Sequence, residues 1–176
     1  MIWEVAADID GSKDTWYYDS AIWTDDSTID TDTESKTKAW FKPLKAIKLQ
    51  MSFAGQAREI YFPLDQEYSS LKELFKGGEV LTKADSGCWR YIVPDGDYQN
   101  NCNRQGFNTM TASSHKTRLG IMYNQENDCN SCDVATGVGV RMWGNDRSAA
   151  NYVGCCSNLG KSTKDAKAMI LIGYMP

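Results

Sequence analysis

Six cysteines constrain the fold of this chain more than any other feature, because all of them lie between its midpoint at residue 88 and residue 156. A zinc site usually shows paired Cys-x-x-Cys or histidine-bearing motifs. This chain has one Cys-x-x-Cys, one adjacent pair and a lone His115 far from either. We therefore expect every cysteine to form a disulfide in an oxidising compartment, with a zinc or redox site as the alternative. The cysteines are Cys88, Cys102, Cys129, Cys132, Cys155 and Cys156.

Length and charge narrow the class of protein further. With 176 residues, 41% of them hydrophobic, the chain can form one domain with a substantial core over 1–176. Its net charge of −4 provides no electrostatic footprint for nucleic acid. No apolar run approaches the roughly 18 residues of a membrane span. The first residues lack a signal-peptide pattern, so the chain is either cytosolic or a mature or excised domain, and the cysteines favour the second.

Apolar patterning predicts mainly strands. Alternation is clearest at 46–53, where Ile47, Leu49, Met51 and Phe53 share one face. The other expected strands are 2–9, 59–64, 90–93, 118–123, 136–143 and 168–174. A helix is expected at 66–76, with Asp65 as N-cap and a stop at 77–78, and a weaker one at 33–41.

Between these elements we expect long loops at 95–114, 124–133 and 144–167. The predicted class is therefore α+β and β-rich. It has a twisted central antiparallel sheet, one or two short helices and loops pinned by disulfides.

Charge is also segregated along the sequence. Residues 1–35 carry eight Asp and two Glu, and 36–50 carry five Lys. This pattern indicates solvated faces that neutralise one another, or an acidic stretch that holds a cation.

One loop is rich in oxygen ligands. Calcium prefers six to eight oxygens from carboxylates, amides and carbonyls, and a disulfide-pinned loop could present them at low ordering cost. The alternative is a turn whose Asn and Asp side chains bond their own backbone. The candidate calcium ligands are Asn124, Glu126, Asn127, Asp128 and Asp133.

Catalysis finds little support. His115 lies in a polar Ser-Ser-His-Lys context that predicts a surface turn, and no Gly-x-Ser-x-Gly or phosphate-binding loop occurs. We therefore expect no enzyme.

Trp143 is followed by Gly144, Asn145 and Asp146, a context that predicts an exposed ring. Trp143, Asn145 and Asp146 are thus the candidate ligand-binding residues, with sugar stacking on the indole.

Several segments, in order, resemble the fibrinogen C-terminal-like family, closest to fibrinogen-related and intelectin-like extracellular domains. The most specific are NCNRQGFN at 101–108 and NQENDC at 124–129; the others are WEVA at 3–6, YDSAIWT at 18–24, LDQEYSSLKELF at 64–75, RLGI at 118–121 and KAMILI at 167–172. The family's N-terminal subdomain has no counterpart here, because Trp3 stands where its first core strand would begin.

The resemblance implies a secreted domain with calcium-bearing loops that recognises glycans. It also favours a Cys102–Cys129 disulfide, because each cysteine lies in one of the specific motifs, and leaves Cys88 and Cys132 to pair within the set that includes Cys155 and Cys156. The expected function is calcium-dependent recognition of a carbohydrate or glycoprotein. The alternative is a structural module of an extracellular matrix, appendage or filament without a small ligand. Self-association or assembly into a larger structure is compatible with both.

Overall fold

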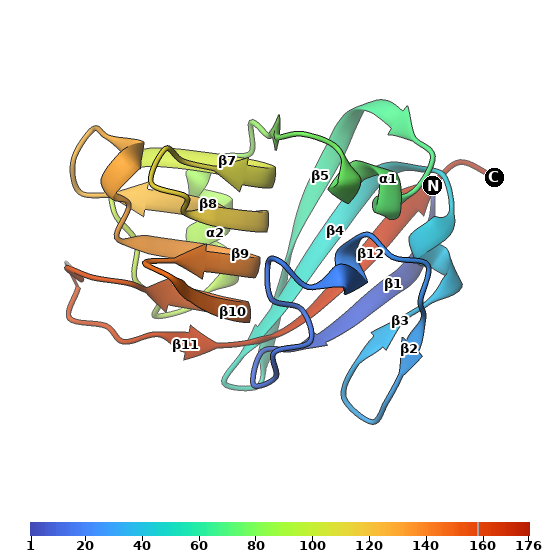
Figure 1. The fold of residues 1–176 in the computed structure, drawn as a ribbon, viewed down its shortest axis with the longest axis horizontal. Helices are drawn as coiled ribbons and strands as arrows, with labels where there is room; N and C mark the ends of the chain where they lie inside the picture. The colour runs from blue at the N-terminus through green and yellow to red at the C-terminus, as the bar shows by residue number, and fades with distance from the viewer. Residues whose placement is uncertain (158) are drawn as a thin grey trace.

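The computed structural model describes residues 1–157 and 159–176, and places them in two antiparallel sheets. Sheet A has the strand order β2-β3-β1-β12-β4-β5 and sheet B the order β11-β10-β9-β8-β7-β6 (Figure 1). Sheet A contains β1 (Ile2–Asp10), β2 (Ile29–Asp30), β3 (Ser35–Lys36), β4 (Leu44–Phe53), β5 (Gln56–Tyr68) and β12 (Lys167–Tyr174). Sheet B contains β6 (Val80–Leu81), β7 (Asn101–Met110), β8 (Lys116–Asn124), β9 (Val134–Met142), β10 (Asn145–Val153) and β11 (Lys164–Asp165).

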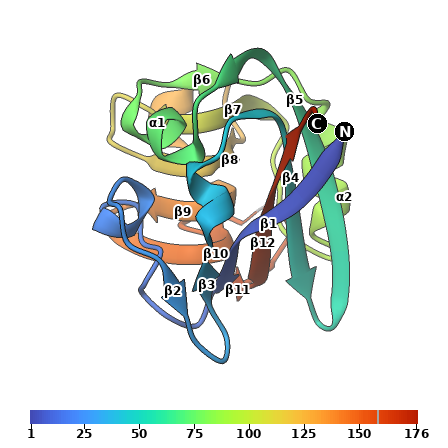
Figure 2. The same ribbon diagram turned by 90° about the vertical axis from the view of Figure 1, so that its right-hand side faces the viewer.

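Short helices connect these strands. The α-helices are α1 (Leu71–Lys76) and α2 (Ser86–Ile92), and the 3₁₀ turns are Ala21–Trp23, Lys38–Phe41 and Cys129–Ser131. The first and last strands are neighbours, with Ile2 opposite Tyr174, so the two termini lie close together (Figures 1 and 2). No helix among the described residues is long and apolar enough to span a membrane.

An aromatic cluster joins the two sheets. The Trp16 and Trp23 rings lie 4.9 Å apart, and Phe75 of α1 lies 4.8 Å from Trp23. Phe75 also lies 6.1 Å from Phe107 of β7, which connects the cluster to sheet B. Edge-to-face aromatic pairs at these separations add to the free energy of burial.

Lys36 is buried beneath this cluster and its charge is fully compensated. Its Nζ donates to the carbonyl of Ile22 at 2.6 Å, and to the carbonyl and carboxylate of Asp25 at 3.0 and 2.8 Å. All three ammonium donors therefore have acceptors, as burial of a charge requires. The predicted neutralisation between the acidic and basic stretches thus occurs in part inside the core.

A row of glycines crosses sheet B. In the register, Gly106 of β7 is opposite Gly120 of β8, which is opposite Gly137 of β9. A Cβ on these residues would lie 2.1, 2.6 and 2.2 Å from the carbonyl oxygens of Val80, Thr136 and Leu119. Only glycine permits backbones to approach so closely, and Gly106 and Gly137 also have positive φ angles of 142° and 148°.

Sheet B folds back on itself along this glycine row. Trp143 directly follows β9 at the tip of the β9–β10 hairpin, and Gly154 directly follows β10 at the open end of the same hairpin. If the nine-residue strands were straight, these two residues would lie about 30 Å apart. Nevertheless, a Cβ on Gly154 would lie 2.4 Å from Trp143 Cδ1. Likewise, Ser113 in the β7–β8 turn donates to the carbonyl of Asn130 in the β8–β9 connection, although these two loops follow opposite ends of β8.

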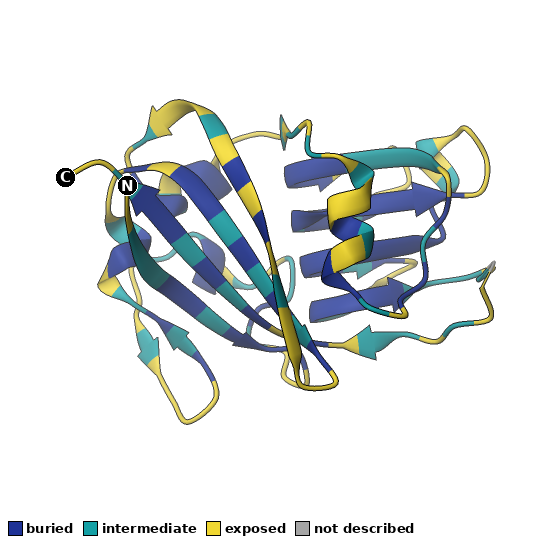
Figure 3. Cartoon of the chain, turned by 180° about the vertical axis from the view of Figure 1, so that it is seen from behind, coloured by how far each residue is buried: buried dark blue, intermediate teal, exposed yellow. Residues whose placement is uncertain are grey.

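The fold of sheet B encloses a second small core. Ala135 precedes Gly137 in β9, whereas Val140 and Met142 follow it, and all three belong to the same buried cluster. Both faces of β9 are consequently covered, and nearly every residue of the strand is buried (Figure 3). The cluster comprises Met122, Cys132, Ala135, Val140, Met142, Ala150 and Tyr152, with Cys102 and Cys129 packed against it.

The β-rich α+β class is confirmed, with 49% strand and 13% helix, but two sheets replace the single central sheet that we expected. Strands occur at 2–9, 46–53, 59–64, 118–123 and 168–174, as predicted, and the strand expected at 136–143 ends one residue earlier, at Met142. The buried face of β4 also matches the predicted alternation.

Four local predictions are wrong. Residues 90–92 belong to α2 and Val93 follows its end; Asp85 caps this helix by accepting from Gly87 N at 2.7 Å. The 66–76 helix begins only at Leu71, with Ser70 as cap, because 66–68 extend β5. The 33–41 helix is reduced to the turn Lys38–Phe41. The loops expected at 95–114 and 144–167 contain β7, β10 and β11, whose small and polar residues show no strand alternation.

The glycine row generates a stability prediction. Gly137→Ala should lower the free energy of unfolding by about 2 kcal/mol or more, because its methyl group would meet the Leu119 carbonyl at a φ that disfavours L-residues. Gly78→Ala is the matched control, since a Cβ there has no neighbour within 4 Å, and should change stability by less than about 1 kcal/mol. Equal denaturant midpoints for the two variants would contradict the role assigned to the row.

Candidate ligand-binding site

Trp143 lies at the tip of the β9–β10 hairpin in an unusual conformation. The two-residue turn Trp143-Gly144 has φ angles of 52° and 76°, the pattern of a type I′ turn. The first position of that turn favours Asn, Asp or Gly, and a bulky residue there is strained. The Trp143 side chain is 49% exposed, as the sequence predicted. Strain of this kind concentrates at functional positions.

His115 holds the indole in place from beneath. The two ring centroids lie 4.8 Å apart, and Trp143 N donates to His115 Nδ1 at 3.4 Å. His115 is only 2% exposed, so the predicted surface turn is wrong for this side chain. Burial lowers the pKa of His115 from its ordinary value of 6.5, and the Asp133 carboxylate opposes the shift.

Two polar residues, Asn145 and Asp146, follow the Trp143 turn at the start of β10. Asn145 is exposed and its Nδ2 donates to the carbonyl of Trp143 at 3.3 Å. Asp146 Oδ2 lies 3.6 Å from Arg141 Nη2, while Asp146 Oδ1 has no hydrogen-bond partner among the described residues. Burial raises the pKa of Asp146, and Arg141 opposes this. The three predicted ligand-binding residues therefore lie within four consecutive positions, with Trp143 in the turn and Asn145 and Asp146 at the start of β10.

Asp133 is buried on the other side of His115 and belongs to a group of oxygens without partners. Burial raises the pKa of Asp133, while the Gln99 side chain lowers it and the charges of Glu126 and Asp97 raise it. Asp133, Asp97 and Gln99 are at most 4% exposed. Asp133 Oδ2, Asp97 Oδ1 and Gln99 Oε1 have no hydrogen-bond partner in the part of the chain that the structure describes. The second Asp97 oxygen accepts from Ser157 Oγ, but a buried oxygen left without a donor or cation is costly.

The other four predicted calcium ligands lie in the 124–131 loop, mostly in hydrogen bonds within it. Asn124 Nδ2 donates to the carbonyl of Asp128 and to Ser131 Oγ, and Asp128 Oδ1 accepts from Asn130 N at 2.8 Å. Glu126 Oε2 is 3.4 Å from Ser131 Oγ, and Asn127 is exposed. These contacts favour the self-bonded turn as the explanation for this loop; Asp133 points elsewhere, toward the buried oxygens.

The cysteine pairing is only partly as predicted. Cys102 and Cys129 form the preferred disulfide. Cys155 and Cys156 bond to each other, however, so Cys88 and Cys132 remain free thiols and the expectation of complete pairing is wrong. Cys88 is exposed on α2, whereas Cys132 is buried against the Cys102–Cys129 bond. Burial and the Asp133 and Asp128 charges raise the pKa of the Cys132 thiol to about 12.

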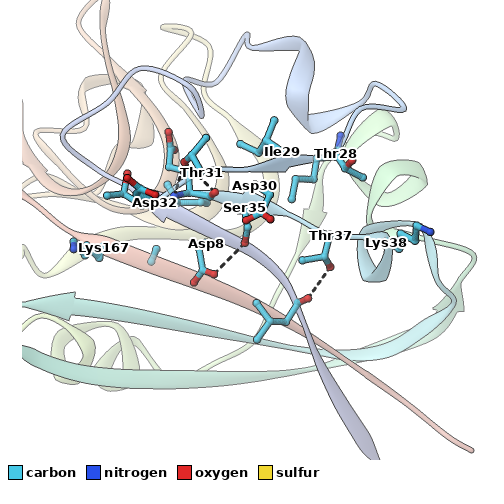
Figure 4. A pocket seen from close by; sticks show the side chains of 16 residues that line it. Asp8, Thr28, Ile29, Asp30, Thr31, Asp32, Ser35, Thr37, Lys38 and Lys167 are labelled. Carbon is cyan, nitrogen blue, oxygen red and sulfur yellow. Dashed lines mark hydrogen bonds between the residues drawn. The ribbon is translucent and has the colours of Figure 1, made fainter.

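A separate pocket of about 800 Å³ lies beside the β2–β3 hairpin, over β1 and β12 (Figure 4). Its lining is rich in hydroxyl and carboxylate groups, including Asp30, Asp32 and Asp8, and Ser35 Oγ donates to Asp8 Oδ2 at 3.0 Å. Lys38 and Lys167 supply positive charge at its edges. The sequence showed this stretch only as acidic, because the hollow arises where the hairpin lies beside β1.

Sequence reasoning missed Asp97, Gln99 and the buried role of His115. Asp97 and Gln99 precede a strand that the sequence did not reveal, and they act on Asp133 from a distant part of the sequence. No local motif signals these contacts.

No family model matches the chain, and neither a curated protein nor a solved structure matches it. Nothing in these comparisons identifies a fibrinogen C-terminal-like domain, so that resemblance stays a prediction.

Buried His115 generates a pH prediction. Below pH 6.5 the unfolded chain binds a proton that the folded chain resists, so His115 makes the free energy of unfolding fall as pH drops. The raised pKa of Asp133 acts oppositely at lower pH, where the folded state keeps a proton longer. Urea midpoints between pH 7.5 and 5.5 should therefore fall less steeply for His115→Gln than for the parent protein. Parallel curves would contradict a buried neutral histidine.

Proposed function

We propose that this chain is an extracellular recognition domain that binds carbohydrate over Trp143. The observation that supports this most is the half-exposed indole, held in a strained turn and packed on buried His115. A fixed aromatic face gives the C–H face of a sugar a stacking surface without an ordering cost. Asn145, Asp146 and Arg141 supply the donors and acceptors that a sugar's hydroxyls need.

We propose that a calcium ion binds to buried residues behind His115 and supports this site. The unpartnered oxygens of Asp133, Asp97 and Gln99 offer a hard cation the ligands it prefers. Glu126 acts on Asp133 electrostatically, so the adjoining loop can contribute a carboxylate. A cation there would fix the β8–β9 connection and the residues behind His115, and so the ligand face. Two disulfides support a secreted location.

A structural module without a small ligand is the second candidate. The observation that favours it is β5, a 13-residue strand that pairs only with β4 and leaves an edge available to another chain. Pro63 and the charges of Arg58, Glu59 and Glu67 along this strand oppose unregulated pairing. A specific partner is needed for this edge to be used.

A glycan array tests the carbohydrate proposal. The parent protein should bind a defined set of glycans, and Trp143→Ala should weaken that binding about tenfold or more, because the stacking surface is lost. Tyr91→Ala is the control, since Tyr91 is 59% exposed on a distant helix and should leave binding unchanged. Absence of glycan binding, together with self-association through β5, would favour the structural module.

Calorimetry and melting test the ion. Calcium at 100 times its dissociation constant should stabilise the parent protein by about 2.7 kcal/mol, and chelation should reverse this. Asp133→Asn should abolish the response, because the amide keeps the shape and removes the charge. Asp128→Asn is the matched variant in the self-bonded loop and should retain it. Loss of the response in Asp128→Asn alone would instead place the ion in the 124–131 loop.

A further inference from the structure

Three sulfur atoms converge at the mouth of the second core. Cys132 Sγ lies 3.4 Å from Cys102 Sγ, which is itself bonded to Cys129. All three Sγ atoms lie within 4.8 Å of one another. Cys102 comes from the start of β7, whereas Cys129 and Cys132 lie three residues apart in the connection between β8 and β9.

This arrangement suits a thiophilic metal ion once the disulfide is open. Zinc–thiolate bonds of about 2.3 Å place the sulfurs of a tetrahedral site roughly 3.8 Å apart. The 3.4 Å contact between Cys102 and Cys132 is already close to that separation. Cys129 and Cys132 also have the two-residue spacing of a zinc knuckle.

The surroundings favour a soft ion as well. The cluster that contains Cys132 includes the thioethers of Met122 and Met142. Cys102 and Cys129 are only partly buried, so solvent can reach the sulfurs and supply a fourth ligand. Thiolate-rich sites of this kind select zinc or copper(I) over calcium and magnesium.

We propose that Cys102, Cys129 and Cys132 form a three-thiolate metal site when the Cys102–Cys129 disulfide is reduced. A phosphine with one water cleaves the S–S bond, yielding two thiols and the phosphine oxide. The metal ion then displaces one proton from each of three thiols. The oxidised form holds a disulfide and one thiol, and the reduced form holds a metal ion, so the loop before β9 is cross-linked in both.

The test uses a full-length background variant that keeps only these cysteines: Cys88→Ser, Cys155→Ser and Cys156→Ser. After phosphine reduction without oxygen, cobalt(II) should bind one ion per chain with a thiolate-to-cobalt charge-transfer band, and zinc should displace it. Zinc should protect all three thiols from iodoacetamide, as read by peptide mass. It should also raise the melting temperature, because a native site stabilises the folded chain.

Cys132→Ser in the same background should lose the cobalt band, and Cys132→Ala, which suits the buried position, should lose it too. The oxidised background protein should not bind cobalt. The proposal is overturned if cobalt binds equally after Cys132 is replaced, if fewer than three thiols are protected, or if zinc lowers the melting temperature through binding to the unfolded chain.

Discussion

The close backbone approach at Gly106, Gly120 and Gly137 is the constraint on which the rest of sheet B depends. A side chain at any of these positions would collide with a neighbouring carbonyl oxygen. Because the glycines are aligned across three strands, the sheet can fold along them rather than bend at one strand alone. The fold encloses the second core and brings the tip of the β9–β10 hairpin to the far end of the same hairpin. Trp143, His115 and Asp133 therefore meet although their strand positions are far apart.

Two further features stabilise this arrangement. The aromatic cluster of Trp16, Trp23 and Phe75 fills the space between the sheets, and Lys36 satisfies its buried charge beneath it. The Cys102–Cys129 bond ties the loop before β9 to the start of β7, next to the folded ends. The arrangement of Trp143, His115 and Asp133 is thus a consequence of packing at several levels.

The sequence predicted the parts of this fold that local pattern determines. Apolar and polar residues alternate along β4, whereas β8 and β12 are short apolar runs, and both patterns are recognisable in the sequence. β7 and β10 escaped prediction because Asn103 and Asn108 adopt positive φ and Ala149 and Ala150 are small, which hides any alternation. Trp143 was predicted to be exposed from its polar neighbours, whereas the effects of Asp97 and Gln99 on Asp133 arise only in the tertiary structure. The expected cysteine pairing was also wrong, because Cys155 and Cys156, which are adjacent in the chain, bond to each other.

The folded sheet is tested most directly by nuclear Overhauser measurements between the Trp143 indole protons and the α-protons of Gly154. A folded sheet should give strong cross-peaks, because a Cβ on Gly154 would lie 2.4 Å from Trp143 Cδ1. Straight nine-residue strands would separate the two ends of the hairpin by about 30 Å and produce no such signal. Cross-strand contacts along the whole of β9 and β10 without any Trp143–Gly154 cross-peak would contradict the central claim.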